Sequence, residues 1–317
     1  MPLALVKTGT YTQRMALSSR AARVVLAFFV AAGTLAAPHA LVAQTPQRAV
    51  YVSVTDPAGN PVPGLGPSDF IVREDNVSRE VLSVAPVDEP MQLAVLLDIS
   101  QAAEAFVRDY RNALTAFITA VTNDTTPKGK HQIALVGIAG RPTILRDYSS
   151  DPTPLLKSAQ SVFSMPDTGT YLLDGIIETS QGIGKREATR PVIVAIITEG
   201  PELSNRPYDL VLQTLKASGA ALHVVKVGSP RNNSYDRAMV IDQGTRTSGG
   251  RNEDLLATTA LPNMMKKLAA DLTHQYRVTY ARPQTLIQPE TVTVAAAKPG
   301  LTARGTAVRP ERPQPRR

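Results

Sequence analysis

Between residues 91 and 274 the sequence alternates short apolar runs with amphipathic stretches, and this alternation limits the fold more than any other feature. The amphipathic stretches have the length and spacing of helices that bury one face. The apolar runs have the length of strands that are covered on both faces of a parallel sheet. The pattern predicts an α/β domain over residues 90–274, with a doubly wound, mostly parallel, Rossmann-like sheet. The expected strands are 92–97, 133–138, 192–197 and 221–227, and the expected helices are 103–121, 154–162, 171–183, 209–218 and 255–272.

Segments of β-type sequence flank this predicted domain on both sides. The N-terminal segment contains AVYVSVTD, DFIVRED and SREVLSVAPV, and the C-terminal segment contains QYRVTY, ETVTVAAA and LTARGTAV. Asp75 and Asn76 lie between two of these runs, and both residue types tolerate the left-handed backbone of a tight hairpin turn. Neither segment is long enough to bury a core alone. We therefore predict one small β-sandwich-like module built from residues 44–89 and 275–308, with the α/β domain inserted in it.

The N-terminus has the features of an export signal. Arg20 and Arg23 precede an apolar run over residues 24–37, which is followed by small residues that end at Ala43. A positive segment, an apolar stretch and an alanine before the cut are typical of a signal peptide. A membrane anchor needs about 20 apolar residues. We expect residues 1–43 to be removed by cleavage near Ala43, with a retained anchor as the alternative.

Composition excludes several classes of function. The chain has no cysteine, which excludes disulfide frameworks, thiolate metal sites and cysteine nucleophiles. In an exported chain this suits a bacterial periplasm or cell surface. The net charge of +7 is concentrated in residues 1–43 and 304–317, whereas nucleic-acid-binding proteins usually spread positive charge over a folded face. We expect a periplasmic, secreted or cell-surface protein that binds no nucleic acid, has no membrane span after cleavage and ends in a disordered tail at 309–317.

Three polar segments follow predicted elements at the edge of the sheet where open α/β sheets bind ligands. The segment DISQA contains Asp98 and Ser100, TGTYLLD contains Thr170, and TEGPELS contains Glu199. These segments resemble the three loops of a von Willebrand factor type A domain, which carry a D-x-S-x-S motif, a threonine in a G-x-T-x-L-x-D stretch, and an aspartate before a glycine. VSVTDPAGNPVPGLGPSDFIVRED, RPTILRDYSSDPTPLL and GTRTSGGRNEDLL extend the resemblance, over about residues 49–306, to the exported bacterial proteins with VWFA-related domains.

The resemblance implies a metal-ion-dependent adhesion site at these loops. Such a site holds Mg²⁺ through hydroxyls, carboxylates and waters and leaves one position for an acidic group of the partner. Asp98, Ser100 and Thr170 match the family pattern, but Ala102 replaces a serine and Glu199 replaces an aspartate. Since Mg²⁺ demands near-ideal octahedral geometry, we expect a degenerate site with Asp98, Ser100, Thr170 and Glu199 as metal ligands and with weak or absent Mg²⁺ binding.

A plainer interpretation of the same residues stays open at this point. Asp98, Ser100 and Thr170 could cap the helices that follow them, as such residues commonly do. Glu199 could be a solvated acid of a loop.

The resemblance implies a non-enzymatic protein-binding, adhesion or scaffold module that recognises a protein or cell-envelope ligand through an acidic group. The alternative is an exported metal- or carboxylate-dependent hydrolase that uses Asp98 and Glu199 at the same edge of the sheet. No nucleophile, base or oxyanion donors accompany the two carboxylates in the sequence. A deep apolar pocket beside Glu199 would favour the hydrolase, and a shallow open surface would favour a binding face. A purely structural domain with an inactive site is a third possibility.

Overall fold

The computed structural model describes residues 47–228, 234–282 and 289–307. The predicted signal peptide, its cleavage site and the predicted disordered tail lie outside the described residues. Residues from Thr45 onward form one compact unit.

The predicted α/β sheet is present, and its strand order is β10-β9-β8-β5-β6-β7. Its four central strands contain the four predicted apolar runs and pair in parallel. The strand β8 explains why these runs are apolar throughout. Val194 and Ile196 of β8 contribute to one hydrophobic core, whereas Ile193 and Ile197 contribute to the core on the opposite face. The strands are β5 (Gln92–Leu97), β6 (Gln132–Ala139), β7 (Arg141–Ser149), β8 (Pro191–Thr198), β9 (Ala221–Val227) and β10 (Asn252–Leu255).

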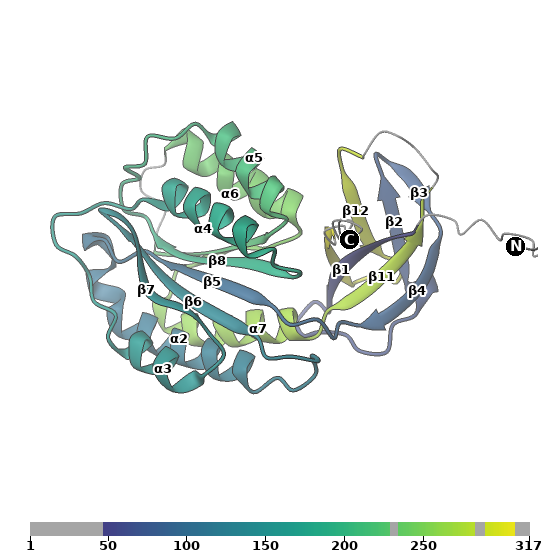
Figure 1. The fold of residues 1–317 in the computed structure, drawn as a ribbon, viewed down its shortest axis with the longest axis horizontal. Coiled ribbons are helices and arrows are strands. Elements are labelled where there is room, and N and C mark those ends of the chain that lie inside the picture. The colour runs from purple at the N-terminus through teal and green to yellow at the C-terminus, as the bar shows by residue number, and fades with distance from the viewer. Residues whose placement is uncertain (1–46, 229–233, 283–288, 308–317) are drawn as a thin grey trace, which may run out of the picture. The chain divides into compact units, whose positions relative to one another are not determined.

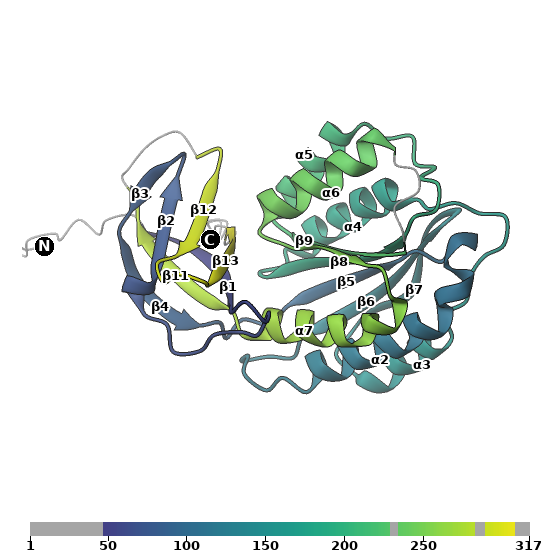
Figure 2. The ribbon, with the colours of Figure 1, turned by 180° about the vertical axis from the view of Figure 1, so that it is seen from behind.

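Helices cover both faces of this sheet, which confirms the doubly wound arrangement (Figures 1 and 2). The helices on one face are α2 (Val107–Thr122), α3 (Pro152–Gln160) and α7 (Leu261–Thr273). Those on the other face are α4 (Leu172–Arg186), α5 (Tyr208–Ser218) and α6 (Tyr235–Ser248). The first turns of the predicted helix 103–121 form the 3-10 helix η2 (Gln101–Phe106). The predicted helix 255–272 was placed too early, because its first residue closes β10 and α7 begins only after the short 3-10 helix η3 (Thr258–Ala260).

The helix α6 and the two edge strands β7 and β10 of the sheet domain were not predicted from the sequence. The helix α6 buries Arg237, Gly244 and Thr245 beside only two apolar residues, so its buried face does not appear as an apolar stripe. The strand β7 is an antiparallel edge strand whose residues are exposed or half-buried. It also contains Pro142, a residue that edge strands tolerate.

The N-terminal and C-terminal β-segments form one module, as predicted. One sheet has the order β13-β1-β11-β4 and the other the order β12-β2-β3. In each sheet, strands from before and after the α/β domain pair in antiparallel fashion. Asp75 and Asn76 form the hairpin turn with positive φ angles of 47° and 65°. The strands are β1 (Gln47–Thr55), β2 (Phe70–Glu74), β3 (Val77–Arg79), β4 (Val81–Pro86), β11 (Tyr276–Ala281), β12 (Val292–Ala296) and β13 (Thr302–Ala307).

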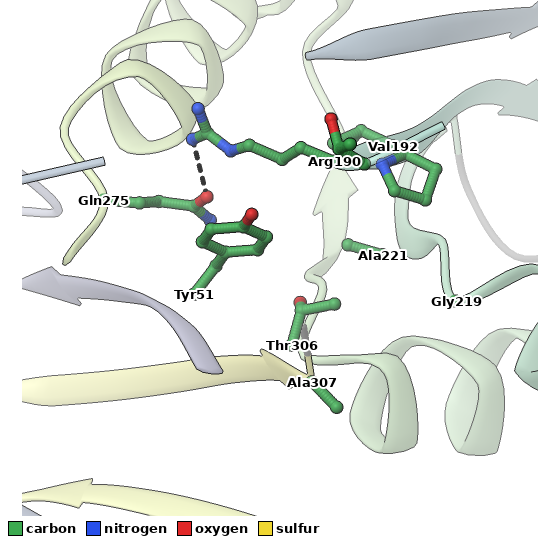
Figure 3. Close-up of a pocket in the computed structure, with 10 residues that line it drawn as sticks. Tyr51, Arg190, Val192, Gly219, Ala221, Gln275, Thr306 and Ala307 are labelled. Carbon is green, nitrogen blue, oxygen red and sulfur yellow. Dashed lines mark hydrogen bonds between the residues drawn. The ribbon is translucent and has the colours of Figure 1, made fainter. Parts of the chain in front are cut away.

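Arg190, which precedes β8, joins the start of the central sheet to the segment that enters β11. Its guanidinium group donates to the side-chain oxygen of Gln275 at 2.7 Å (Figure 3). It also donates to the carbonyl oxygen of Leu272. The cavity beside it, which Tyr51 also lines, has a volume of only about 10 Å³. A cavity of this size has room for about one water molecule, so it is not a ligand site.

Candidate functional site

Asp98, Ser100 and Thr170 lie together at the carboxyl end of the sheet. Asp98 directly follows β5, and its Oδ2 accepts a hydrogen bond from the Thr170 hydroxyl at 2.8 Å. Its Oδ1 accepts from the backbone N–H of Ser100 at 3.0 Å. All three residues are fully buried. Two of the predicted loops therefore meet at the Asp98 carboxylate.

Thr198 is a fourth member of this cluster that was missed from the sequence. It is the last residue of β8, and its backbone N–H donates to Asp98 Oδ2 at 3.0 Å. Its hydroxyl donates to the same oxygen. Because β5 and β8 are adjacent parallel strands with Leu97 opposite Ile196, Asp98 and Thr198 lie within one residue of the same level of the sheet. The predicted ends of these two strands, at residues 97 and 197, could have indicated that Asp98 and Thr198 lie close together. We call Asp98, Ser100, Thr170 and Thr198 the oxygen cluster.

Glycine at position 200 allows the loop after β8 to approach the loop after β5. A Cβ atom added to Gly200 would lie 2.7 Å from the Cβ of Ala102 and 3.5 Å from the Ser100 hydroxyl. The first of these distances is shorter than a van der Waals contact. A serine at position 102 would therefore bring its hydroxyl beside the oxygen cluster, whereas the alanine offers no oxygen there.

The helix-capping interpretation is wrong for Ser100 and Thr170. Ser100 is the N-cap of η2, but its side chain makes no capping hydrogen bond. The N-cap of α4 is Tyr171, again without a side-chain cap. The hydroxyl of Thr170 is bonded instead to Asp98. The Ser100 hydroxyl is buried and has no hydrogen-bond partner.

The oxygen cluster has the donor types that Mg²⁺ prefers, namely one carboxylate and several hydroxyls. The Ser100 hydroxyl without a partner is free to serve as a ligand, and Thr170 keeps its lone pairs because it donates its proton to Asp98. Asp98, in contrast, already accepts hydrogen bonds at both carboxylate oxygens. These residue types could hold a cation, and the weak Mg²⁺ binding expected from the sequence stays a prediction. Among the described residues, His, Asp and Glu side chains form no group of three that could hold a metal.

Glu199 makes no described hydrogen bond or ion pair with the oxygen cluster, so its predicted role as a metal ligand stays a prediction. Successive side chains along a strand point to opposite sides. Since Thr198 turns its hydroxyl toward Asp98, the next side chain is directed away from it. Glu199 lines a separate cavity of about 490 Å³ whose other walls come from β9, β10 and α6. We call it the β8–β9 cavity.

Arg237 of α6 holds the loop that carries Glu199. Its side chain is 2% exposed, and it donates to the carbonyl oxygens of Gly200, at 2.8 Å, and of Thr198.

The buried side chain of Tyr110 on α2 is affected by the charges of both Asp98 and Arg237. Burial raises the pKa of Tyr110 well above its ordinary value, the negative charge of Asp98 raises it further, and the positive charge of Arg237 opposes these two effects. The charges of Asp98 and Arg237 thus act on the same buried region.

The loop after β8 also fixes the Thr170 loop. The N–H of Thr170 donates to the carbonyl of Pro201 at 2.9 Å, and the N–H of Leu203 donates to the carbonyl of Thr170 at 2.8 Å. Glu202 accepts from the N–H of Leu172, the first residue of α4, at 3.2 Å. A carboxylate at this position also interacts favourably with the helix dipole. Burial raises the pKa of Glu202, and hydrogen bonds from Ser204 oppose that shift.

The surface around the oxygen cluster carries exposed apolar side chains. We call the surface of residues 98–102, 163–171 and 199–204 the crest. Phe163 is 61% exposed and Leu203 is 49% exposed. A Cβ atom added to Gly169 would lie 2.7 Å from Leu203, so Leu203 packs directly over the residue that precedes Thr170.

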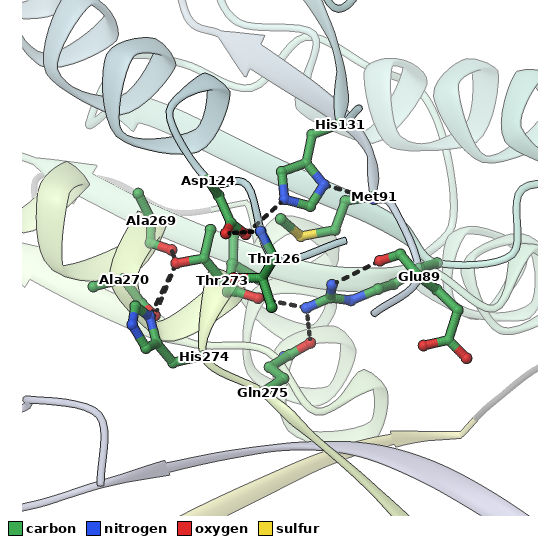
Figure 4. Close-up of polar contacts among 12 residues, drawn as sticks. Glu89, Met91, Asp124, Thr126, His131, Ala269, Ala270, Thr273, His274 and Gln275 are labelled. Atoms are coloured by element: carbon green, nitrogen blue, oxygen red, sulfur yellow. Dashed lines mark hydrogen bonds and ion pairs between the residues drawn. The ribbon is translucent and has the colours of Figure 1, made fainter. Parts of the chain in front are cut away.

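His131 lies far from the crest, next to the amino end of β5, and is a packed residue. Its Nδ1 accepts from the N–H of Met91 at 2.9 Å, and its Nε2 lies 3.0 Å from a carboxylate oxygen of Asp124 (Figure 4). Since Nδ1 is an acceptor, the proton of the neutral ring is on Nε2 and is donated to Asp124. Burial lowers the pKa of His131, and the contact with Asp124 partly offsets that shift.

No family model and no curated protein matches this sequence. Solved structures of von Willebrand factor type A domains are similar to it. One is a von Willebrand factor type A protein from Catenulispora acidiphila, with 10% identity over 82% of this chain and 72% of that chain and a TM-score of 0.49. Another is the conserved hypothetical protein BatB from Bacteroides thetaiotaomicron, with 14% identity over 57% of this chain and 98% of that chain and a TM-score of 0.44.

A third is the vWF domain of the type V pili tip protein Mfa5 from Porphyromonas gingivalis. It has 12% identity over 59% of this chain and 96% of that chain, with a TM-score of 0.44. At these identities the similarity concerns the fold alone. In the part of the chain that the structure describes, no helix is long and apolar enough to cross a membrane. The strand order and the helices on both faces give the α/β domain the doubly wound, mostly parallel architecture that the sequence predicted, and von Willebrand factor type A domains are among the solved structures similar to it.

Proposed function

We propose that the protein is an exported, non-enzymatic binding module whose crest recognises a protein or cell-envelope partner. The observation that carries this proposal is the oxygen cluster at the carboxyl end of the sheet, with the unpartnered Ser100 hydroxyl inside it. Open α/β sheets bind their ligands at this end. The exposed side chains of Phe163 and Leu203 beside the cluster supply apolar contact area for a partner.

Mg²⁺ is proposed as a weakly bound or absent component of this site. Asp98, Ser100 and Thr170 would hold it, and when bound it would attract an acidic group of the partner. The two departures from the family pattern, Ala102 and Glu199, both lower its expected affinity. Apolar and polar contacts of the crest would then supply most of the binding energy.

The hydrolase alternative has less support. The cavity beside Glu199 is lined by four charged residues as well as by apolar ones, so it is not the apolar pocket that would favour the hydrolase. The charged residues are Lys226, Arg237, Asp242 and Asp254. A hydroxyl nucleophile also needs a base within hydrogen-bond distance. The Ser100 hydroxyl has no partner of any kind.

Binding of the mature chain to a cell-envelope fraction tests the proposal. We expect Leu203→Asp to weaken binding by at least about tenfold, because it places a charge in the apolar part of the crest. Ile144→Asp is the matched control, since Ile144 is 67% exposed on the edge strand β7, outside the crest. Equal binding by Leu203→Asp and the native chain, with both folded, would contradict the proposal. Hydrolysis of an envelope polymer that is lost in Asp98→Asn would favour the alternative.

A further inference from the structure

The β8–β9 cavity is a second candidate site, distinct from the oxygen cluster. Its volume of about 490 Å³ falls within the range of about 300–1,000 Å³ that is usual for small-ligand pockets. It lies at the carboxyl ends of β8 and β9, where open sheets bind ligands. Its lining combines charged side chains with the apolar side chains of Ala238, Ile241 and Leu256.

The two positive charges of the cavity are occupied within the protein. Lys226 forms an ion pair with Asp254, with 2.7 Å between Nζ and Oδ1. Arg237 donates both terminal nitrogens to backbone carbonyl oxygens. Neither group is therefore available as the main partner of an anionic ligand.

Glu199, in contrast, forms no hydrogen bond or ion pair among the described residues. Its Oε2 is buried and has no hydrogen-bond partner, and the described residues contain no ion pair of this carboxylate. A buried carboxylate oxygen without a donor is unfavourable. The Glu199 side chain as a whole is half-buried and lines the cavity, so a ligand with a charged N–H donor would give its carboxylate a counter-ion. The other acid of the cavity, Asp242, lies near Arg246 at 3.5 Å, and both side chains are well exposed.

The apolar wall indicates the shape of such a ligand. Leu256 is 77% exposed, and together with Ile241 it can cover a hydrocarbon chain. Lysine and arginine side chains combine an apolar stem with a cationic end and bury the stem along apolar surfaces. In the cavity, Ile241 and Leu256 would contact the apolar stem, and Glu199 would lie near the cationic end.

We infer that the β8–β9 cavity binds the side chain of a lysine or arginine from a protein partner, with Glu199 as the counter-ion. The inference rests on the proposed function in taking the partner to be a protein. It also gives a physical reason for glutamate at position 199, since its carboxylate belongs to this cavity and not to the oxygen cluster.

Calorimetric titration of the full chain tests the inference. The probes are the N-acetyl amides of lysine, arginine and norleucine, the last with a comparable stem but no charge, together with pentane-1,5-diamine as a free amine. We expect the lysine and arginine amides to bind and the norleucine amide to bind at least about tenfold more weakly. Equal binding of norleucine, or no binding of the cationic amides at millimolar concentration, would overturn the inference. A diamine that binds more tightly than both cationic amides would overturn the assignment to a protein side chain.

Glu199→Gln keeps the shape of the side chain and removes its charge. It should lower the affinity for the lysine amide by at least about tenfold, while the matched control Glu80→Gln, at an exposed residue of the β-module outside the cavity, should leave the affinity unchanged. Equal binding by Glu199→Gln and the native chain, with equal thermal stability, would overturn the inference. Leu203→Asp separates the two proposals. If the Leu203→Asp variant loses envelope binding but keeps lysine-amide binding, the proposed function and the inference are both supported. If the native chain binds the envelope fraction but not the lysine amide, the inference is wrong and the proposed function of the crest is unaffected.

Discussion

Replacement of Thr198 by valine should destabilise the protein through the oxygen cluster. Valine has nearly the shape of threonine but lacks the hydroxyl, which donates to Asp98 and accepts from the N–H of Gly200 at 3.2 Å. A hydrogen bond to a charged acceptor contributes about 1.5–3 kcal/mol, and a buried N–H left without a partner costs about 1–3 kcal/mol. Since Asp98 keeps three other donors, we expect a loss near the lower end of the sum, about 3 kcal/mol.

Urea denaturation measures this loss as a lower midpoint with an unchanged slope. Thr247→Val is the matched control, because the Thr247 hydroxyl bonds only to the carbonyl of Gln243 on the exposed side of α6. It should change the free energy of unfolding by less than about 0.5 kcal/mol. If Thr198→Val were as harmless as this control, the Asp98 carboxylate would not be held by the hydroxyl of Thr198, and the described geometry of the site would be wrong.

Three further predictions concern other parts of the molecule. Asp271 is buried, with 2.9 Å between its Oδ2 and Nε of the buried Arg251. Asp271→Ala should lower the free energy of unfolding by about 3 kcal/mol, because it leaves Arg251 with only the longer ion pair to Glu253, at 3.6 Å; an effect below about 1 kcal/mol in urea denaturation would refute this. Burial, followed by the charges of Arg251 and Arg304, lowers the pKa of His223 from 6.5 to about 3, so its contribution to stability is present above pH 6.5 and is lost by up to about 1.4 kcal/mol per pH unit as the pH falls. His223→Leu should show a flatter decline between pH 6.5 and 5, and an unchanged slope would contradict the assignment. Mass spectrometry of the envelope fraction should find an N-terminus near Gln44, whereas an intact N-terminus in the cytosol would exclude export.

Much of the fold could be predicted because its strands are covered on both faces. Every residue of β8 is buried, and such a run is visible in the sequence without any knowledge of its neighbours. The helix α6 was missed for the opposite reason. Its largest buried side chain is Arg237, whose burial is favourable only because the carbonyl groups of Thr198 and Gly200 accept its hydrogen bonds. Those acceptors lie more than 35 residues away in the chain.

The candidate site could be predicted in part, for a related reason. Asp98, Ser100 and Thr170 follow the first strand and the central loop, so their positions indicated a shared edge of the sheet. Thr198 donates to Asp98, a residue 100 positions earlier in the chain. A single threonine in the sequence does not indicate such a contact. The neighbouring Glu199 was predicted as a ligand because it is an acid at the position of the family aspartate. The alternation of side chains along the strand directs it instead to the β8–β9 cavity, which it lines.

The most direct test of the degenerate site is calorimetry with Mg²⁺ and Mn²⁺ on the native chain and on the double variant Ala102→Ser with Glu199→Asp. The serine would return a hydroxyl beside Ser100 and Gly200, and the aspartate would restore the residue of the family pattern at position 199. We expect weak or undetectable binding by the native chain and an affinity at least about tenfold higher in the double variant, equivalent to about 1.4 kcal/mol. Tight Mg²⁺ binding by the native chain would contradict the proposal that Ala102 and Glu199 lower the affinity. An unchanged Mg²⁺ affinity in the double variant would show that the oxygen cluster is not a metal site.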